Sequence, residues 1–126
     1  MHYIHLTEDS DGVSRFEDRA FAMEMGDFAP PAPAMWLTET MSAGQCLFLT
    51  LPAGWGGAQH PSPREQIGIC LSGRVRVEAG DGETREFGAG AIWWMADTKG
   101  AGHITTVLGD EDVHMCIVQL GSAQKS

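Results

Sequence analysis

The sequence contains no asparagine and few positive charges. Eight Lys and Arg residues stand against 17 Asp and Glu residues, which gives a formal net charge of −9. Without asparagine the chain has no acceptor for N-linked glycans. An acidic surface repels the phosphates of nucleic acids and the anionic lipids of membranes. We therefore expect no nucleic acid and no membrane among the partners, and we interpret the acidity as solvated surface.

Long apolar runs and cysteine motifs are also absent. No run approaches the roughly 20 residues that a membrane helix needs, and residues 1–5 lack the basic start and apolar stretch of a signal peptide. The three cysteines, Cys46, Cys70 and Cys116, are widely spaced, and no CxxC motif occurs. This pattern argues against a zinc ribbon or a thioredoxin motif and predicts buried free thiols. We therefore expect a cytoplasmic protein.

Several catalytic motifs are missing as well. The chain has no GxxxxGK[ST] loop for nucleotide phosphates, no GxSxG nucleophile turn and no HExxH zinc motif. No glycine-rich dinucleotide fingerprint follows a strand and opens a helix. Nucleotide hydrolysis, serine hydrolase chemistry, zinc proteolysis and dinucleotide binding are therefore poor explanations of this sequence.

Glycine and proline, by contrast, are frequent and divide the chain into short apolar segments. The 16 Gly and six Pro residues separate runs with little helical periodicity, which is typical of many short strands and predicts an all-β sandwich or barrel. At 126 residues and 43% hydrophobic content, residues 1–126 are expected to form one domain. The expected strands are 3–6, 35–41, 45–51, 65–71, 74–78, 84–87, 91–95, 103–108 and 113–120, with an extended piece near 14–21.

The proline-rich segment 28–33, Phe-Ala-Pro-Pro-Ala-Pro, interrupts this pattern. It cannot form a helix or a central strand, because proline lacks a backbone N–H. We predict an extended arm that lies over the domain. Residues 1–40 would then contain N-terminal strands and this arm, and residues 41–121 would form the barrel.

Two stretches carry a family resemblance. From Gly54 the chain reads glycine, five residues, His60, one residue, Ser62, three residues, Gln66, six residues, Gly73. This resembles the first cupin motif in every spacing, with Ser62 in the place of a second histidine and Gln66 in the place of a glutamate. The Asp11-Gly12 start and the wording around both motifs are similar to a subgroup of small, mostly uncharacterised bacterial cupins.

The second stretch runs from Gly90 to His103 and is similar to the second cupin motif. Ala96 stands where that motif has proline, the following loop is longer by two residues, and Val107 stands where it has asparagine. The resemblance implies a double-stranded β-helix, or jelly-roll cupin barrel, with the N-terminal segment as an extended arm. It also implies that His60, Gln66 and His103 converge inside the barrel.

Two imidazoles and one amide oxygen can hold a divalent metal such as Fe, Mn, Ni or Zn. Because all three ligands are neutral, the metal charge would favour a chelating anion. The same three side chains can instead form a hydrogen-bonded polar cluster without a metal. Both interpretations remain open at this point, and Ser62 is expected to reach a metal only weakly or through water.

Ser62 is also a candidate for lining a substrate pocket, and four further residues join it, each with a structural alternative. Arg64 can bind a carboxylate or lie at the rim. Asp97 can orient a ligand histidine, act as a base or stabilise its own turn. Strand alternation allows only one of Trp93 and Trp94 to face inward, and we take Trp94 as the candidate. His114 would face the barrel together with Cys116 and Val118, or serve packing alone.

The sequence thus supports two kinds of function. The first is a small metal-dependent enzyme that acts on a small anionic or enolisable molecule by oxygenase, isomerase or lyase chemistry. The alternative is a cupin that binds a small molecule without a metal, or has a structural role, and has no catalytic activity. Because small cupins resemble one another in forming dimers through sheet edges, we also expect a homodimer in which the arm covers an exposed edge.

Overall fold

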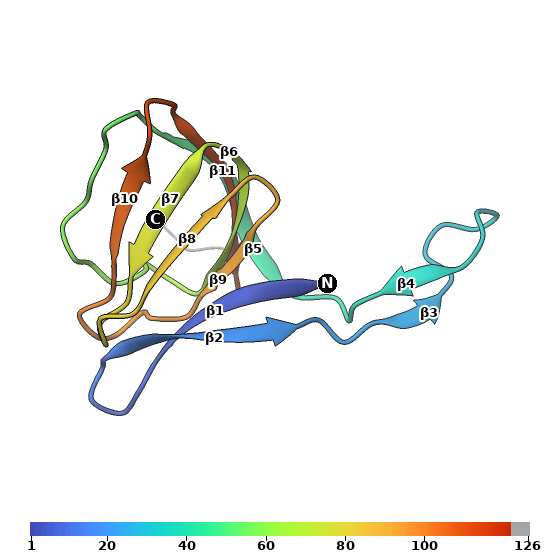
Figure 1. Ribbon diagram of the computed structural model, residues 1–126. Coiled ribbons are helices and arrows are strands. Elements are labelled where there is room, and N and C mark those ends of the chain that lie inside the picture. Colours follow the sequence, from blue (N-terminus) through green and yellow to red (C-terminus); the bar gives the residue numbers. More distant parts are fainter. Residues whose placement is uncertain (122–126) are drawn as a thin grey trace.

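The short apolar segments form eleven strands, and no helix occurs within residues 1–121, which are the residues that the structure describes. The structure is a computed structural model (Figure 1). Its strands are β1 (His2–Glu8), β2 (Ser14–Ala20), β3 (Glu24–Gly26), β4 (Met35–Leu37), β5 (Ala43–Leu51), β6 (Gln66–Ser72), β7 (Arg74–Glu78), β8 (Thr84–Gly88), β9 (Ile92–Met95), β10 (Ile104–Leu108) and β11 (Val113–Leu120). The all-β prediction is therefore confirmed. No helix among these residues is long and apolar enough to span a membrane.

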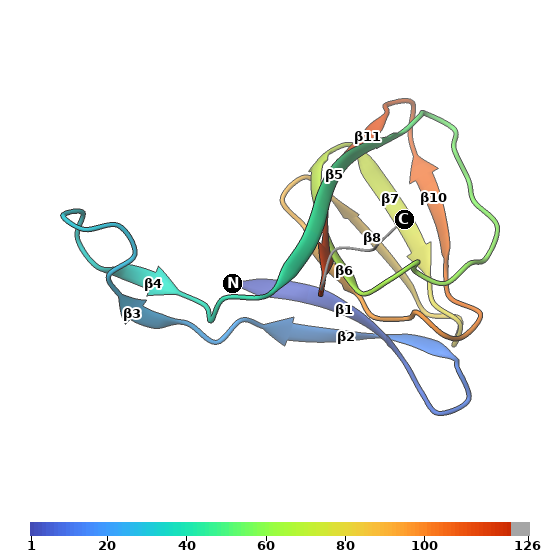
Figure 2. The ribbon, with the colours of Figure 1, turned by 180° about the vertical axis from the view of Figure 1, so that it is seen from behind.

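Two sheets face each other and enclose the core (Figures 1 and 2). The larger has six strands in the order β2-β1-β9-β6-β11-β5, and the smaller has the order β10-β7-β8. Strand β7 shows why the sheets pack: Val75 and Val77 are fully buried, while the charged residues between and beside them are exposed. Period-two alternation places the valines against the opposite sheet.

Strand β11 turns a different set of side chains inward from the set predicted. Val113, Met115 and Ile117 are at most 3% exposed, whereas His114 is exposed and its Nδ1 lies 2.8 Å from the hydroxyl of Thr50. The prediction that His114 faces the barrel is therefore wrong. Both faces of β11 carry apolar residues, so the sequence pattern does not distinguish inside from outside.

The N-terminal strands belong to the barrel wall. Strand β1 pairs in parallel with β9, with Ile4 opposite Trp93 and Leu6 opposite Met95, and it pairs antiparallel with β2 on its other side. Leu6 is fully buried in the core. The first 20 residues thus extend the larger sheet, whereas the sequence had grouped them with the arm.

The arm is a hairpin that points away from the barrel (Figures 1 and 2). Strands β3 and β4 pair antiparallel as a separate two-stranded sheet, and the proline-rich segment forms the turn region between them. The predicted strand 35–41 is reduced to Met35–Leu37. The expectation that the arm lies over its own domain is wrong, because prolines specify extended backbone but not the direction in which it leaves the barrel.

Leu6→Ala tests whether β1 is an integral part of the core. Because Leu6 is fully buried, its truncation is expected to lower the free energy of unfolding by about 2–5 kcal/mol. Leu71→Ala is the matched control, since Leu71 is 50% exposed and its change should stay within about 0.5 kcal/mol. Chemical denaturation measures both, and equal losses would contradict this placement of β1.

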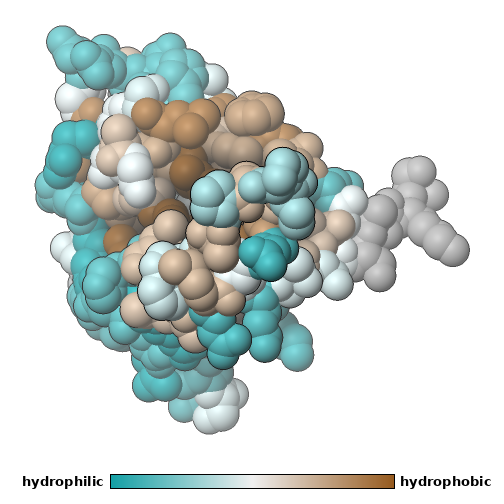
Figure 3. Space-filling model, turned by 90° about the vertical axis from the view of Figure 1, so that its right-hand side faces the viewer, coloured by the Kyte–Doolittle hydropathy of each residue, from teal (hydrophilic) through white to brown (hydrophobic). Residues whose placement is uncertain are grey.

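The prediction of a homodimer can be tested at the arm. Apolar side chains gather beside it (Figure 3), and a cavity of about 560 Å³ there is lined by Trp36, Ile67, Ile69 and Val118 among others. A two-stranded hairpin is marginally stable alone, and Trp36 is 63% exposed. We expect light scattering to give twice the mass of one chain, and Trp36→Asp to reduce it. Val13→Asp, in the β1–β2 turn, should leave the mass unchanged, and a monomeric wild type would contradict the prediction.

Candidate functional site

A loop segment beside β10 brings the two motif histidines together. The backbone N–H of His60 donates to the carbonyl of His103 at 3.1 Å, and the N–H of His103 donates back at 3.0 Å. The segment continues antiparallel to β10, since Gly57 bonds to Thr105. Such an exchange places two residues directly opposite each other. The imidazole centroids are consequently 5.1 Å apart.

Gly102 permits this close approach. Its φ is +81°, which L side chains rarely adopt, and a Cβ at this position would collide with the carbonyl of His60. Glycine removes both obstacles. The pairing of His60 with His103 therefore requires glycine at position 102.

A buried carboxylate orients His103. Asp97 is fully buried, and its Oδ2 accepts a hydrogen bond from Nδ1 of His103 at 2.5 Å. The hydroxyl of Ser62 donates to Oδ1 of the same carboxylate at 2.8 Å. A carboxylate on Nδ1 fixes the proton there and leaves Nε2 as the acceptor. Ser62 is therefore committed to Asp97, and Asp97 makes the orienting contact that was one of its predicted alternatives.

The ring of His60 is also oriented through its Nδ1, in this case by a backbone carbonyl. Its Nδ1 lies 2.9 Å from the carbonyl of Pro61, which accepts the Nδ1 proton and leaves Nε2 unprotonated in the neutral ring. Within residues 1–121, no hydrogen bond engages Nε2 of His60 or His103. The site therefore presents two nitrogen lone pairs from adjacent rings.

Gln66 belongs to a row of amides that crosses three strands. Gln45 donates to Gln119, Gln119 donates to Oε1 of Gln66 at 2.9 Å, and Nε2 of Gln66 lies 3.5 Å from the sulfur of Met95. The ladder places Gln119 opposite both of the other glutamines. The oxygen of Gln66 thus already accepts one hydrogen bond, and one of its two lone pairs is left for a ligand.

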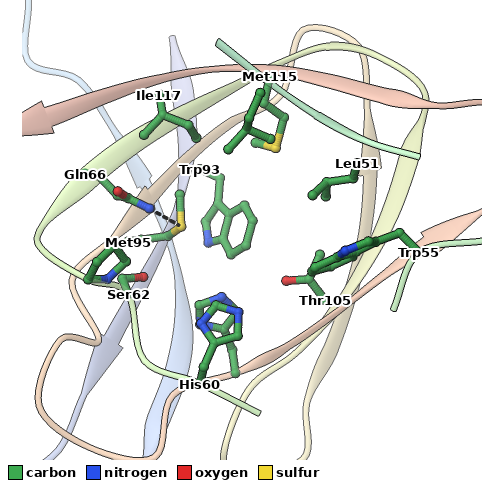
Figure 4. Close-up of a pocket in the computed structure, with 13 residues that line it drawn as sticks. Leu51, Trp55, His60, Ser62, Gln66, Trp93, Met95, Thr105, Met115 and Ile117 are labelled. Carbon is green, nitrogen blue, oxygen red and sulfur yellow. Dashed lines mark hydrogen bonds between the residues drawn. The ribbon is translucent and has the colours of Figure 1, made fainter. Parts of the chain in front are cut away.

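These side chains form the polar end of a cavity of about 110 Å³ (Figure 4). The cavity is lined by Leu49, Leu51, Trp55, His60, Ser62, Pro63, Gln66, Trp93, Met95, His103, Thr105, Met115 and Ile117. Trp93 is 3% exposed, and its indole N–H has no hydrogen-bond partner among the described residues. Figure 4 shows that nitrogen on the side of the ring nearest Met95 and Gln66. The buried end of the pocket therefore contains one unsatisfied donor, the indole N–H of Trp93, in addition to the two free Nε2 acceptors of the histidines.

Four predicted site residues, His60, Ser62, Gln66 and His103, line this pocket. Four others do not. Asp97 lies behind His103, His114 is on the outer face, and Arg64 donates to the carbonyl of Leu120 at 3.1 Å.

Trp94 was the wrong choice between the two tryptophans. Its indole N–H donates to Glu65 at 2.7 Å, and its ring lies 5.4 Å from that of Tyr3 on the other side of the sheet. Trp93 faces the pocket instead, because it shares a face of β9 with Met95. The sequence could not show which of the two faces inward, because both faces of β9 carry tryptophan and other apolar residues.

Among the described residues, the groups in this pocket that could ligate a metal are two imidazoles and one amide oxygen. The free Nε2 atoms of His60 and His103 are suitable ligands, and their Nδ1 contacts resemble those that orient metal-binding histidines. The third ligand would be the oxygen of Gln66, which is shared with Gln119. No group of three His, Cys, Asp or Glu side chains within the described residues is arranged to hold a metal.

Comparisons with known proteins identify the class of fold. A cupin domain model matches residues 47–119. A solved Cupin 2 conserved barrel domain protein from Salinispora arenicola is similar at 18% identity and a TM-score of 0.50, over 79% of this chain and 74% of that one. The Cnp3 cupin domain of Schizosaccharomyces pombe is similar at 14% identity and a TM-score of 0.48, over 86% and 73%. A search of curated proteins finds no match.

The two facing sheets thus form a double-stranded β-helix, or jelly-roll barrel, as the sequence predicted. The family model covers more than half of the chain, from β5 to the end of β11. The chain belongs to the cupin family. The similarity to the Salinispora arenicola structure, at 18% identity, supports the fold and carries no information on the ligand.

Asp97→Ala tests the orienting role of the carboxylate. In the wild type, imidazole ¹⁵N spectra should show His103 protonated at Nδ1, and the variant should lose this preference because the acceptor is gone. The unpaired Nδ1–H should also lower the free energy of unfolding by about 1–3 kcal/mol. Ser62→Ala is the control, because it removes only the second donor and should retain the tautomer. An unchanged tautomer in Asp97→Ala would refute the role.

Proposed function

We propose that this cupin binds a compact, uncharged molecule in the barrel pocket, with His60, His103 and Trp93 as its polar contacts. The observation that carries this proposal is the buried indole N–H of Trp93, which lacks a partner next to two free imidazole nitrogens. A buried donor without a partner costs about 1–3 kcal/mol. An oxygen atom of a ligand that accepts this hydrogen bond would recover that energy.

The charge of the pocket favours a neutral ligand. Among residues 1–121, no Lys or Arg lines it, and the buried carboxylate of Asp97 lies directly behind His103. An anion would therefore meet no counter-charge while losing its hydration, which is costly in an apolar cavity. The walls, formed by leucine, methionine, isoleucine and tryptophan, suit an apolar remainder of the ligand.

The size of the cavity limits the ligand. A closed cavity of about 150 Å³ accommodates benzene, so the 110 Å³ pocket takes a molecule of that size only if part of it remains in the mouth. His60 is exposed at this mouth, whereas His103 is 2% exposed. The two histidines therefore contact the outer and inner parts of the same bound molecule.

The geometry suits a ligand that carries a hydroxyl or enol beside a carbonyl. The hydroxyl would donate to Nε2 of His103, and the carbonyl oxygen would accept from Trp93. If the ligand is enolisable, His103 is the group placed to take its proton, and Asp97 would stabilise the imidazolium that results. The enolisable substrate predicted from the sequence agrees with this arrangement, and the anionic one does not unless a metal is bound.

A metal-dependent enzyme is the second candidate, favoured by the two free Nε2 atoms on rings only 5.1 Å apart. His60, His103 and Gln66 would hold the ion. When bound, it would supply the positive charge that the pocket lacks and polarise an oxygen of the ligand. An anionic ligand is then expected, so the two candidates differ in the charge of the molecule that they bind.

A thermal-shift experiment separates the two candidates. Acetylacetone and phenol serve as neutral probes and pyruvate as an anionic probe, each with EDTA and with added Mn²⁺, Ni²⁺ or Zn²⁺. We expect the neutral probes, in excess of their Kd, to raise Tm by about 2 °C or more in the presence of EDTA. Pyruvate should have no effect under that condition.

Matched variants assign the effect to the pocket. Trp93→Phe keeps the aromatic ring but removes the N–H, and His103→Ala removes the acceptor, so both should reduce the shift. Trp94→Phe and His114→Ala, which alter residues outside the pocket, should not. A shift that appears only with pyruvate and metal, and disappears with EDTA, would replace the proposal by the metal-dependent candidate.

A further inference from the structure

Two cysteines that are 70 residues apart in the sequence lie in contact on the outer face of the larger sheet. The sulfur atoms of Cys46 on β5 and Cys116 on β11 are 3.7 Å apart. The ladder places Cys46 opposite Val118 and Cys116 opposite Phe48, so the two thiols are diagonal neighbours on one face. The short distance between the sulfur atoms shows that the two side chains meet across this diagonal. The proximity is therefore set by the register of the sheet.

The surroundings of the three cysteines differ. Cys46 is exposed, Cys116 is partly buried, and Cys70 is fully buried in the core. The sequence had predicted buried thiols throughout, which is wrong for Cys46. Burial, together with the neighbouring Cys46 thiol, raises the pKa of Cys116, and burial also raises the pKa of Cys70. Exposure thus marks Cys46 as the thiol that an oxidant in solution meets first.

We propose that Cys46 and Cys116 form a reversible intramolecular disulfide, with Cys46 as the reacting thiol and Cys116 as the resolving thiol. Hydrogen peroxide oxidises the Cys46 thiolate to a sulfenic acid, and one oxygen leaves as water. The sulfur of Cys116 then attacks the Cys46 sulfur, the S–S bond forms and the sulfenic oxygen leaves as a second water. A dithiol reductant returns two electrons and two protons and restores both thiols.

The two sulfur atoms must approach each other for the bond to form. A disulfide bond is about 2.05 Å long, and the two sulfur atoms start 3.7 Å apart. Rotation about χ1 of Cys46 is available because its side chain is exposed. The two strands are already paired over their whole length, so the new bond would join segments that the fold holds in place.

The bond would act on the pocket wall from outside. The inner residues of the same two strands include Leu49, Met115 and Ile117, which line the barrel cavity. Met115 and Ile117 directly flank Cys116 in the chain. A covalent link between β5 and β11 would therefore stiffen the apolar side of the cavity, whatever ligand the cavity takes.

The experiment uses the full chain and hydrogen peroxide. After treatment, intact-mass analysis should show the loss of two hydrogen atoms, about 2 Da, and alkylation after denaturation should label one thiol in place of three. Peptide mapping should identify the labelled residue as Cys70. Closing a loop of this length should also raise Tm by roughly 5 °C or more, and dithiothreitol should reverse all three changes.

Matched variants make the outcome decisive. Cys46→Ser and Cys116→Ser should each abolish the mass loss, whereas Cys70→Ser should retain it. In Cys116→Ser, the sulfenic acid at Cys46 should persist and react with dimedone, because the resolving thiol is absent. Disulfide-linked pairs of chains, or oxidation of Cys46 to sulfinic acid in the wild type, would overturn the proposal. These readouts are independent of ligand binding in the pocket.

Discussion

The exchange of backbone hydrogen bonds between His60 and His103 is the contact on which the site depends. It joins the two family motifs, which lie far apart in the chain, and aligns the loop segment before β6 with the first residue before β10. Because backbone groups make this contact, it does not depend on the side chains at positions 60 and 103. The imidazoles meet as a consequence, and Gly102 is the residue that leaves room for them. Asp97 and Ser62 then fix the direction in which one of the rings points.

Two residues within the first motif differ from the family pattern and set the chemistry of the barrel. Ser62 has no imidazole, and its short hydroxyl turns toward Asp97, so one ligand position of the family pattern becomes support for His103. Gln66 replaces a charge by an amide, and the amide joins a row with Gln119 and Gln45. In the part of the chain that the structure describes, the polar end of the pocket consequently has no lining carboxylate and no lining cation. This neutrality is the physical reason for favouring hydrogen bonding over charge pairing in the proposed function.

The larger sheet is apolar on both of its faces, and the two faces have separate roles. The inner face forms the core and the pocket wall, with Met115 and Ile117 as neighbours of the cavity. The outer face carries Cys46 and Cys116 and the apolar surface beside the arm. Since successive residues of a strand point to opposite faces, the residues of β11 alternate between the inner face and the outer face.

The sequence by itself determined the all-β class, most strand positions, and the family, because glycine and proline spacing and the two motifs are local features of the chain. The resemblance carried by those motifs also implied that His60, Gln66 and His103 converge, and all three line one pocket. Only the tertiary structure decided which tryptophan faces the cavity, that His114 lies outside, and that the arm leaves the barrel. The first two outcomes depend on which face of a strand points inward, and a strand that is apolar on both faces does not reveal this in its sequence. The third depends on the direction in which a hairpin leaves the sheet, which its local sequence does not specify. The contact between Cys46 and Cys116 is of the same kind, since it follows from the register of β5 against β11.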